Sequence, residues 1–413
     1  MITGLSIQNF KNLAEVPCEG EGRFIRFSLL NVLIGPNGAG KSSLLQAVDF
    51  LRAFFRSSVE VYLKDKGWDY RDLPNLRRSS KTMRWAVEAE LRYRNASHTY
   101  AYRVSLQPRR HLGIGHEQLI RISDGPDGEA KLKTLLLRKG RKCHLYNEIL
   151  GGLDDITAIG LPASVMSRLD SAADEEKYPE LLMFRKWVEG FRSYLIWDPK
   201  VLRSPDRGAH GEVGTSGEHL ASVIGRLRDR DRPAFDKLVR RVKRLFPTLT
   251  DVSVAGRGRA WRALRFHENK GNGRTVAFKG EHMSDGLLRL LAVASLLYVD
   301  QTPSLVTFEE PENGVHPQLL REVVQILREI TQRKAPSPCQ VFVATHSPYV
   351  LDEFYDHPEQ VYCMERPRPG AGARILRLSD NSQLEIARKS FKHSLGEAWF
   401  MGLLGATAGQ GGS

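Results

Sequence analysis

The segment at residues 35–42, which reads GPNGAGKS, constrains the fold of this chain more than any other part of the sequence. It matches the pattern G-x-x-x-x-G-K-[ST] and follows an apolar run, FSLLNVLIG, that is typical of a buried strand. The stretch after it, SSLLQAVDFLRAFF, has apolar residues at helical spacing. A strand, a glycine-rich loop and a helix in this order can surround a polyphosphate with backbone N–H groups at the positive end of a helix dipole. The sequence therefore predicts a phosphate-binding loop in an α/β domain.

Two side chains at the end of this loop carry its expected chemistry. The ammonium group of Lys41 is expected to reach the β- and γ-phosphates, and the hydroxyl group of Ser42 is expected to bind Mg²⁺. The predicted ligands are therefore ATP or GTP together with Mg²⁺. The residues expected to contact the nucleotide are Asn37, Gly38, Ala39, Gly40, Lys41, Ser42 and Ser43.

Two adjacent carboxylates end a second apolar strand. The segment 303–317 reads PSLVTFEEPENGVHP, so Glu309 and Glu310 come directly after the strand residues. In a phosphate-loop enzyme the first such acid holds Mg²⁺ through water, and the next one orients or polarises the attacking water. A strand that ends in a solvated acidic turn is the alternative, and a phosphate loop in the same chain favours the catalytic interpretation.

Two further elements have features of a phosphate site. The sequence SDGLLR at 284–289 opens an apolar helix, with Ser284 as the expected N-cap and the helix N-terminus able to face an anion. His346 follows the strand QVFVAT, where its imidazole could touch a γ-phosphate. An ordinary helix cap and a structural histidine are the alternatives.

The order of these four elements resembles that of the ABC-type ATPases, and most closely the RecF-like, SMC-like and OLD-like "AAA family" ATPases of prokaryotes. The resemblance covers nearly the whole chain and includes IQNFKNL, FKGEHMSDGLLRLLAVASLL, FEEPENGVHP and ATHSPYVLD. It implies a dimer in which the loop, the two glutamates and His346 of one subunit meet the SDG element of the other across a shared ATP. The SDG residues in trans are Ser284, Asp285 and Gly286.

Other positions are assigned through the same resemblance. Lys11 and Asn12 match positions that flank the nucleotide in RecF-like heads, and Gln107 is the candidate for the glutamine that senses Mg²⁺ in related enzymes. Two positions differ from the motifs of the ATP-binding subunits of ABC transporters. Asp285 stands where those motifs have a glycine, and Glu309 stands where they have an aspartate.

The resemblance also implies a function. It predicts ATP hydrolysis coupled to closure of a homodimer, or of a higher oligomer of dimers, in sensing or handling DNA. Similar chains are the ATPase components of antiphage defence systems such as Septu-like modules, which implies an effector protein from a neighbouring gene. No nuclease activity is expected in this chain, since the short stretch after His346 lacks an acidic triad for a two-metal nuclease.

The charge distribution supports an acidic partner. The formal net charge is +13, and most of the basic excess lies in the segments 77–144 and 226–265. Such segments favour nucleic-acid binding, with a solvated basic surface as the alternative. The expected DNA contacts lie in the sequence RKGRK and on one face of the helix RPAFDKLVRRVKRLF: Arg138, Lys139, Arg141, Lys142, Arg240, Arg241, Lys243 and Arg244.

The expected fold class is α/β, an ABC-type P-loop ATPase head with a large inserted lobe of strands and helices. The head is assigned to 1–60 and 250–405, the insert to 61–249 and a flexible tail to 406–413. The long insert argues against one alternative function, the ATP-binding subunit of a membrane transporter. A second alternative, a regulatory ATPase scaffold that binds protein, is kept. Four widely separated cysteines, no bilayer-spanning apolar segment and no secretion signal predict a cytoplasmic protein.

Overall fold

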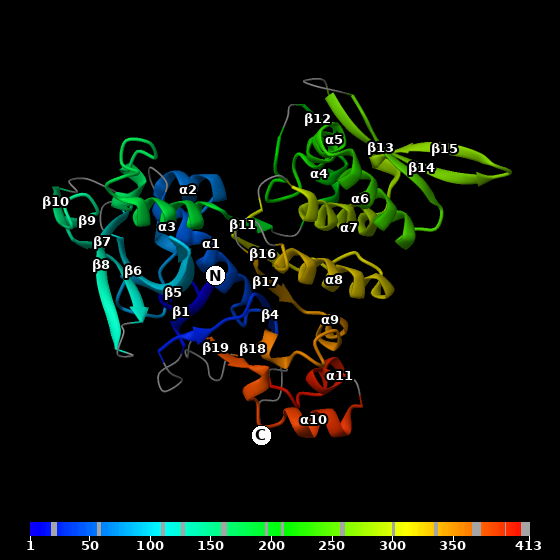
Figure 1. Cartoon of the computed structure of the whole chain (residues 1–413). Coiled ribbons are helices and arrows are strands. Elements are labelled where there is room, and N and C mark those ends of the chain that lie inside the picture. Colours follow the sequence, from blue (N-terminus) through cyan, green and yellow to red (C-terminus); the bar gives the residue numbers. More distant parts are fainter. Residues whose placement is uncertain are drawn as a thin grey trace. The chain divides into compact units, whose positions relative to one another are not determined.

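The computed structural model describes residues 1–17, 23–55, 59–108, 112–124, 129–157, 163–194, 197–207, 210–256, 261–299, 302–333, 338–365, 373–392 and 394–405 (Figure 1). The chain forms two compact units. Unit 1 comprises Met1–Phe191, Pro358–Ile386 and Met401–Ser413, and unit 2 comprises Arg192–His357 and Ala387–Phe400. Cys18 and the expected tail at 406–413 lie outside the described residues, while Cys143, Cys339 and Cys363 are free and buried thiols.

A nine-stranded antiparallel sheet dominates unit 1. Its order is β10-β9-β8-β7-β6-β5-β1-β2, with β3 also paired to β1. Strands β5 and β6 pair in antiparallel. Because β5 pairs with β1, the strands expected in an insert continue the sheet of the N-terminal strands, and the first segment of unit 1 extends to Phe191. The strands are β1 (Ile2–Phe10), β2 (Leu13–Val16), β3 (Ile25–Arg26), β5 (Met83–Tyr93), β6 (Ala96–Pro108), β7 (Leu112–Asp124), β8 (Ala130–Lys139), β9 (Lys142–Asn147) and β10 (Gly152–Thr157).

Helices cover one face of this sheet. The predicted helix after the phosphate loop is α1 (Lys41–Phe55), and it is followed by α2 (Val59–Lys66) and α3 (Pro179–Glu189). The ring of Phe50 in α1 lies 5.4 Å from that of Trp85 in β5, and the ring of Phe184 in α3 lies 5.4 Å from that of Tyr102 in β6. Alternate residues of β5 and β6 are therefore buried against helices, and the residues between them face away from the helices.

Unit 1 also holds the strand that leads into the phosphate loop. All five residues of β4 (Leu30–Ile34) are buried, as is typical of a parallel strand covered on both faces. Within unit 1, β4 pairs in parallel with β18 (Val361–Glu365), and β19 (Arg374–Arg377) pairs with β18 in antiparallel. The predicted strand before the loop is confirmed.

Unit 2 contains a second parallel strand pair surrounded by helices. The strands β16 (Leu305–Glu309) and β17 (Gln340–Thr345) pair in parallel, so their carboxyl ends meet at one edge. The last three residues of β11 (Phe191–Tyr194) lie beside β16, where the Thr307 hydroxyl donates to that of Ser193 at 3.0 Å. The helices are α4 (Pro199–Arg203), α5 (Leu220–Arg230), α6 (Arg232–Leu245), α7 (Asp285–Ser295), α8 (Leu320–Thr331), α9 (Pro348–Asp352) and α11 (Leu395–Phe400), and α10 (Leu384–Ser390) begins in unit 1.

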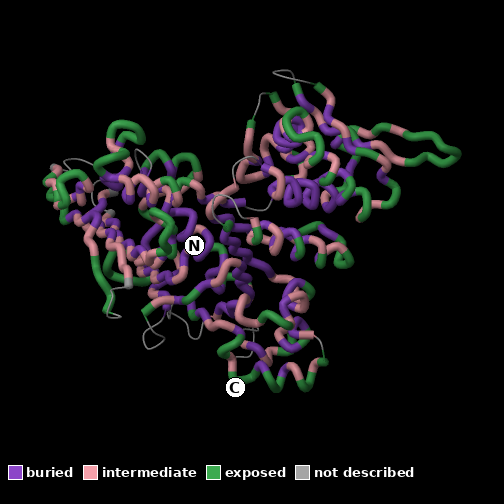
Figure 2. Tube along the Cα trace, viewed as in Figure 1, coloured by how far each residue is buried: buried purple, intermediate pink, exposed green. Residues whose placement is uncertain are grey.

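The most apolar helix is α7, which is buried along its whole length except at its first residue (Figure 2). Ser284 caps this helix, because its side chain accepts a hydrogen bond from the Leu287 N–H at 3.3 Å, as the sequence predicts. Among the described residues, no helix combines the length and the apolar character that crossing a bilayer requires.

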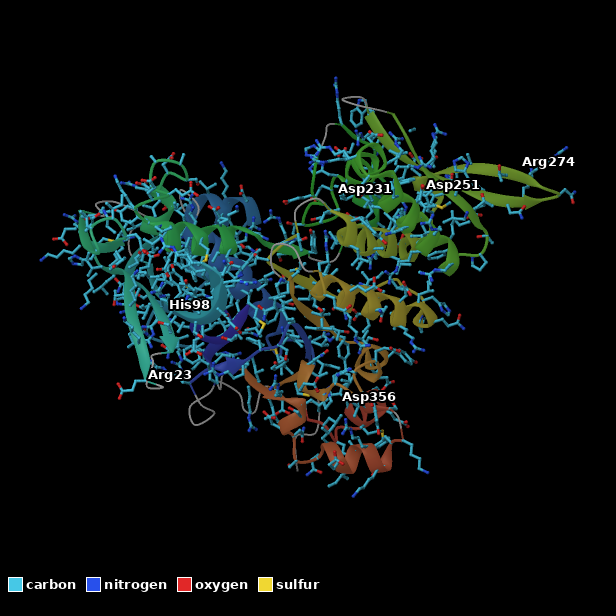
Figure 3. The ribbon with its side chains drawn as sticks, in the orientation of Figure 1. Arg23, His98, Asp231, Asp251, Arg274 and Asp356 are labelled. Carbon is cyan, nitrogen blue, oxygen red and sulfur yellow. The ribbon has the colours of Figure 1, made fainter. Side chains whose placement is uncertain are left out.

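A small antiparallel sheet completes unit 2. It is formed by β12 (Asp206–Arg207), β14 (Trp261–Gly271) and β13 (Leu249–Ala255), with β15 (Arg274–Lys279) paired to β14. Asn272 and Gly273 both have positive φ, 52° and 72°, which are the angles of a tight type I′ hairpin turn. Arg274 lies at the tip of this hairpin (Figure 3).

Candidate nucleotide-binding and hydrolysis residues

The phosphate loop has the strand, loop and helix geometry that its sequence predicts. The loop leaves β4 after Ile34, and α1 begins at Lys41. Lys41 is 5% exposed, and its ammonium group donates to the carbonyl oxygens of Gly35 at 2.7 Å and Pro36 at 3.1 Å. The Ser42 side chain is exposed at the start of the helix, where the first backbone N–H groups have no intrahelical acceptor. The loop can therefore offer an ammonium group, a hydroxyl group and N–H donors to an anion.

Three glycines are required by this loop. A Cβ atom on Gly35 would lie 2.5 Å from the carbonyl oxygen of Met364 in β18, so only glycine fits beside that strand. Gly38 and Gly40 have φ of 74° and 109°, which L side chains rarely adopt. A Cβ atom on Gly38 would meet nothing within 4 Å, so the loop is open on the side where a phosphate would bind.

The structure brings Asn12 and Lys11 next to the loop and its helix. The Asn12 amide donates to the Gly38 carbonyl at 3.2 Å, and its buried Oδ1 atom accepts no hydrogen bond from the described residues. The Lys11 ammonium donates to Gln46 of α1 at 2.6 Å and lies 3.5 Å from the centre of a Trp68 ring. Gln46 and Trp68 were not predicted, because nothing in their local sequence indicates this contact. The side chains of Asn12 and Lys11 thus contact the phosphate loop and its helix directly.

The carboxylates predicted to act in hydrolysis lie at the carboxyl edge of β16 and β17. Glu309 is the last residue of β16, and Glu310 follows it with a left-handed backbone, φ 47°. The Glu310 N–H donates to the Ala344 carbonyl of β17 at 2.8 Å, which fixes this unusual conformation. Its carboxylate lies 3.2 Å from Nε2 of His346. The structure therefore places Glu310 and His346 together, because each follows the carboxyl end of one of two paired parallel strands, β16 and β17.

Glu312, two residues further on, is held differently. The Thr345 hydroxyl donates to its carboxylate, and Thr345 in turn accepts from the Ser347 N–H at 2.9 Å. Burial raises the pKa of Glu312, although the hydrogen bond from Thr345 acts in the opposite direction. Glu312 therefore stabilises the turn after Glu310, because its carboxylate is engaged by the Thr345 hydroxyl.

The SDG element packs against the turn that follows Glu310. A Cβ atom on Gly286 would lie 2.8 Å from the Gly314 carbonyl oxygen, so the close approach requires glycine. Arg289 is 7% exposed and donates to the Asn313 carbonyl of the same turn. Asp285 forms an ion pair with Arg203, which also donates to the Met283 carbonyl at 2.9 Å. Helix α7 and the Glu310 turn are thus joined directly within unit 2.

A narrow pocket borders the two glutamates. It is lined by Trp197, Arg289 and Phe308 together with Glu309, Glu310 and Pro311. Burial lowers the pKa of Arg289, although Asp285, Asp198 and Glu310 act in the opposite direction. Trp197 and Arg289 were not predicted as site residues, because their sequence neighbours carry no recognisable motif for this role.

Gln107 lies on β6, and its side chain packs against Gly115 of β7. A Cβ atom added to Gly115 would lie 3.0 Å from the Gln107 side chain. Unit 1 therefore holds Lys11, Asn12, Gln107 and the loop residues Asn37 to Ser43, while unit 2 holds Ser284, Asp285, Gly286, Glu309, Glu310 and His346.

Two of the expected DNA contacts are wrong, because their guanidinium groups are engaged inside the protein. Arg138 is 3% exposed and donates to the carbonyls of Ala163 at 2.8 Å and Gly140 at 3.1 Å. Arg241 is 8% exposed and pairs with Glu329 at 2.6 Å and with Glu322, both on α8. The other six expected contacts, Lys139, Arg141, Lys142, Arg240, Lys243 and Arg244, are exposed.

The exposed face of the nine-stranded sheet carries a row of cations that the sequence analysis missed. Directly opposite residues on neighbouring strands run from Gln8 through Arg84, Ser105, His116 and Lys139 to Lys142. Arg103 lies beside this row, opposite Ala86. Because directly paired residues point to the same side of a sheet, these side chains share one face. They form the basic sheet face, defined by Arg84, Arg103, His116, Lys139 and Lys142.

The basic sheet face surrounds a hollow of about 380 Å³ lined by Arg84, Arg103 and His116 with Ser6, Gln8 and Ser105. Within the described part of the chain, Arg84, Arg103, Lys139 and Lys142 form no ion pair, and Arg84 contacts only the Gln8 amide oxygen at 3.5 Å. Partial burial lowers the pKa of His116, and the charges of Lys139 and Arg103 lower it further. A carboxylate, that of Glu15, lies opposite Gln8 at one end of the row, so the positive charge is concentrated between Arg84 and Lys142.

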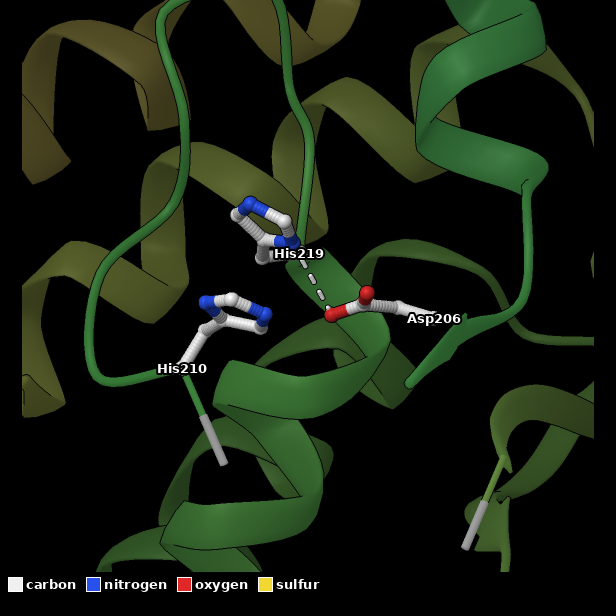
Figure 4. Close-up of side chains that lie close together, drawn as sticks. All are labelled: Asp206, His210 and His219. Carbon is white, nitrogen blue, oxygen red and sulfur yellow. Dashed lines mark hydrogen bonds and ion pairs between the residues drawn. The ribbon is translucent and has the colours of Figure 1, made fainter. Parts of the chain in front are cut away.

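Unit 2 also contains a cluster of metal-ligand side chains. Asp206, His210 and His219 each offer one ligand atom, and these atoms lie within 4.8 Å of one another (Figure 4). The His219 Nδ1 atom is 3.0 Å from an Asp206 carboxylate oxygen. Although partial burial raises the pKa of Asp206, hydrogen bonds with Ser222 and His219 outweigh it and lower the pKa overall. The spacing of Asp206, His210 and His219 in the sequence matches no familiar motif, so the cluster was not predicted.

The glycine-rich loop between a buried strand and α1, with Lys41 and Ser42 at its end, defines a P-loop nucleotide-binding protein. The sequence matches the family model described as "AAA domain, putative AbiEii toxin, Type IV TA system" over residues 30–114 and 167–352. This match covers more than half of the chain, and the protein belongs to this AAA domain family. Among curated proteins, none matches this chain.

The fold is similar to that of SMC head domains. The SmcHead bound to the C-winged helix domain of ScpA aligns at TM-score 0.50 and 13% identity, covering 91% of this chain and 97% of that one. The Smc head domain with an extended coiled coil bound to the C-terminal domain of ScpA, derived from Pyrococcus furiosus, aligns at TM-score 0.44 and 13% identity, covering 95% and 99%. The family match confirms the expected AAA family, and the likeness to the SmcHead agrees with the expected α/β fold of an ABC-type head.

Proposed function

We propose that this protein binds and hydrolyses ATP with Mg²⁺ in a head-to-tail dimer and couples its nucleotide state to DNA and to a partner effector. The observation that carries the proposal is the pairing of Glu310 with His346 at the carboxyl edge of β16 and β17, in a chain that also has a complete phosphate loop. An ATPase needs a phosphate cradle and a base that activates water, and this chain offers both.

Each residue has a defined role in the proposed reaction. Lys41 exchanges the carbonyls of Gly35 and Pro36 for phosphate oxygens, and Ser42 and Glu309 hold the metal. When bound, Mg²⁺ neutralises charge on the phosphates. Glu310 orients the attacking water and accepts its proton, while His346 steadies the carboxylate from 3.2 Å and faces the γ-phosphate.

The SDG element is proposed to face the ATP of the partner subunit. Ser284 is exposed at the N-terminus of α7, and Gly286 and Arg289 of that helix contact the turn after Glu310. Movement of α7 on meeting a γ-phosphate would therefore reach the Glu310 turn of the same subunit. This contact supports coupling between dimer closure and hydrolysis.

A shared site predicts complementation between inactive variants. Ser284→Arg and Lys41→Ala proteins are each expected to be inactive, but a mixed dimer contains one intact composite site. An equal mixture should regain about a quarter of wild-type ATP turnover, measured by phosphate release, if subunits exchange randomly. Mixed dimers shown by native mass spectrometry that recover no activity would indicate that each site lies within one chain.

DNA contact is proposed mainly at the basic sheet face. Its row crosses the strands from β1 to β9, which at about 4.8 Å per strand spans roughly 24 Å. A DNA strand carries one phosphate per about 3.4 Å of helix axis, so a duplex laid along the row presents several phosphates to it. Cations without ion pairs around an open hollow provide the charge complementarity. The exposed α6 cations Arg240, Lys243 and Arg244, beside a hollow of about 590 Å³, are the second candidate surface.

Charge reversal on the basic sheet face is expected to weaken DNA binding. The Arg84→Glu/Arg103→Glu protein should bind duplex DNA less tightly, and the slope of log affinity against log salt should fall by about 2, because each phosphate contact contributes about 0.9. Fluorescence anisotropy between low and physiological salt measures the slope. Arg92→Glu is the matched control, since Arg92 is exposed on the same strand eight residues from Arg84.

The same titration compares the two surfaces. If Arg240→Glu/Arg244→Glu lowers the slope and Arg84→Glu/Arg103→Glu does not, the DNA contact lies on α6. Equal binding by all variants, independent of salt, would contradict DNA handling and favour a protein-binding ATPase.

The effector belongs to the proposal because the sequence motifs of this chain resemble those of ATPase components of antiphage defence systems. We propose that the ATPase dimer controls such an effector, encoded nearby, and that this chain cuts no nucleic acid by itself.

A further inference from the structure

We propose that Asp206, His210 and His219 form a binding site for a divalent transition metal, with Zn²⁺ as the ion. One carboxylate oxygen and one nitrogen from each imidazole lie within 4.8 Å of one another. Imidazole nitrogens combined with a carboxylate suit zinc and related metals, whereas Mg²⁺ and Ca²⁺ prefer oxygen ligands alone. The site is separate from the residues assigned to ATP.

The two histidines are arranged around the same carboxylate. Their ring centres are 3.6 Å apart and their planes differ by 14°, so the rings stack face to face. His219 Nδ1 is 3.0 Å from the Asp206 carboxylate, and a nitrogen of His210 points toward the same group (Figure 4). A ring nitrogen binds a metal in the plane of its ring, so binding of one ion by all three ligand atoms requires the two imidazoles to rotate out of this stack.

The backbone at His219 supports this use of its side chain. Its φ of 69° is left-handed, a conformation that L residues rarely adopt. His219 occupies the N-cap position of α5 but makes no side-chain hydrogen bond to the helix. In this conformation the imidazole of His219 points to Asp206 and His210 instead. Residues with unusual backbone angles are frequent at ligand-binding sites.

The surroundings of Asp206 resemble the support that metal ligands receive. Asp206 is fixed on β12 by pairing with Arg262 of β14, and its carboxylate also hydrogen-bonds with Ser222, which is fully buried in α5. Such outer hydrogen bonds orient ligating side chains. His210 is exposed, so water can complete the coordination from that side. A bound ion would tie β12 to the start of α5.

Metal titration of the full chain tests the site. After treatment with EDTA and gel filtration, the protein is titrated with Zn²⁺ by isothermal calorimetry and with Co²⁺ by visible absorption, without nucleotide. Wild-type protein should bind one ion per chain, and Co²⁺ should show d–d bands typical of nitrogen and oxygen ligands. Zn²⁺ should also raise the thermal unfolding midpoint, because it binds only the folded site.

The variants decide the assignment. His210→Ala/His219→Ala and Asp206→Asn should each lower Zn²⁺ affinity at least ~10-fold, while His98→Ala/His282→Ala, which removes as many histidines elsewhere, should match wild type. Circular dichroism checks that each variant is folded, and Asp206→Asn keeps the size of the side chain. Wild-type protein that binds neither ion, or equal affinity in wild type and both cluster variants, would overturn the site.

Discussion

The Glu310→Gln protein is expected to bind ATP with wild-type affinity and to hydrolyse it about 10²- to 10⁴-fold more slowly, which is the usual contribution of a general base. Glutamine keeps the shape of the side chain and its position 3.2 Å from His346 but cannot accept a proton. ATP should therefore persist in the closed dimer. Single-turnover hydrolysis, nucleotide binding and dimer content by light scattering separate loss of the chemical step from loss of binding.

The matched control is Glu353→Gln, a half-buried glutamate of unit 2 that the proposal places outside the site. It should retain wild-type turnover. Normal hydrolysis by Glu310→Gln would contradict the assignment of Glu310 as the base. Loss of ATP binding together with hydrolysis would show instead that Glu310 mainly supports the local fold.

The Lys41→Ala protein is expected to lose nucleotide affinity and hydrolysis together. A hydrogen bond to a charged group contributes about 1.5–3 kcal/mol, so removal of the ammonium should weaken ATP binding at least ~10-fold. Its present acceptors are backbone carbonyls of its own loop at 2.7 and 3.1 Å, so the substitution removes the cation and leaves the glycines of the loop in place. Titration with a fluorescent ATP analogue measures the affinity.

Lys64→Ala is the control for Lys41→Ala, since Lys64 is exposed on α2. It should bind ATP as wild type does. Because Lys41 is buried, thermal unfolding of both variants establishes whether the loop remains folded. A folded Lys41→Ala protein with unchanged ATP affinity would contradict the phosphate-loop assignment.

The sequence predicts best those features that depend on a few neighbouring residues. Gly38 and Gly40 mark the positive φ angles of the phosphate loop, and Ser284 caps α7 as its position before the helix indicates. The strand ends at Glu309 and at Thr345, just before His346, follow from apolar runs that stop at polar residues. These features need only short-range sterics and hydrogen bonds, which a short segment contains in full.

Contacts between distant segments could not be read from the sequence. Arg241 belongs to a basic helix, but Glu322 and Glu329 on α8 remove it from the surface. Arg138 is likewise drawn inward by the Ala163 carbonyl. A basic run shows how many cations a segment has, while burial depends on the acceptors that other elements bring to each one.

The sequence by itself determined the phosphate loop, the pair of acids at a strand end and the capped SDG helix, because each is encoded in consecutive residues. Only the tertiary structure decided that Arg84, Arg103 and His116 share one face, since this depends on the register of three paired strands. It also decided that Gly286 meets Gly314, and that Asp206 and His219 meet across a chain turn. Strand register and the packing of separate elements determine these contacts, and neither is encoded in consecutive residues.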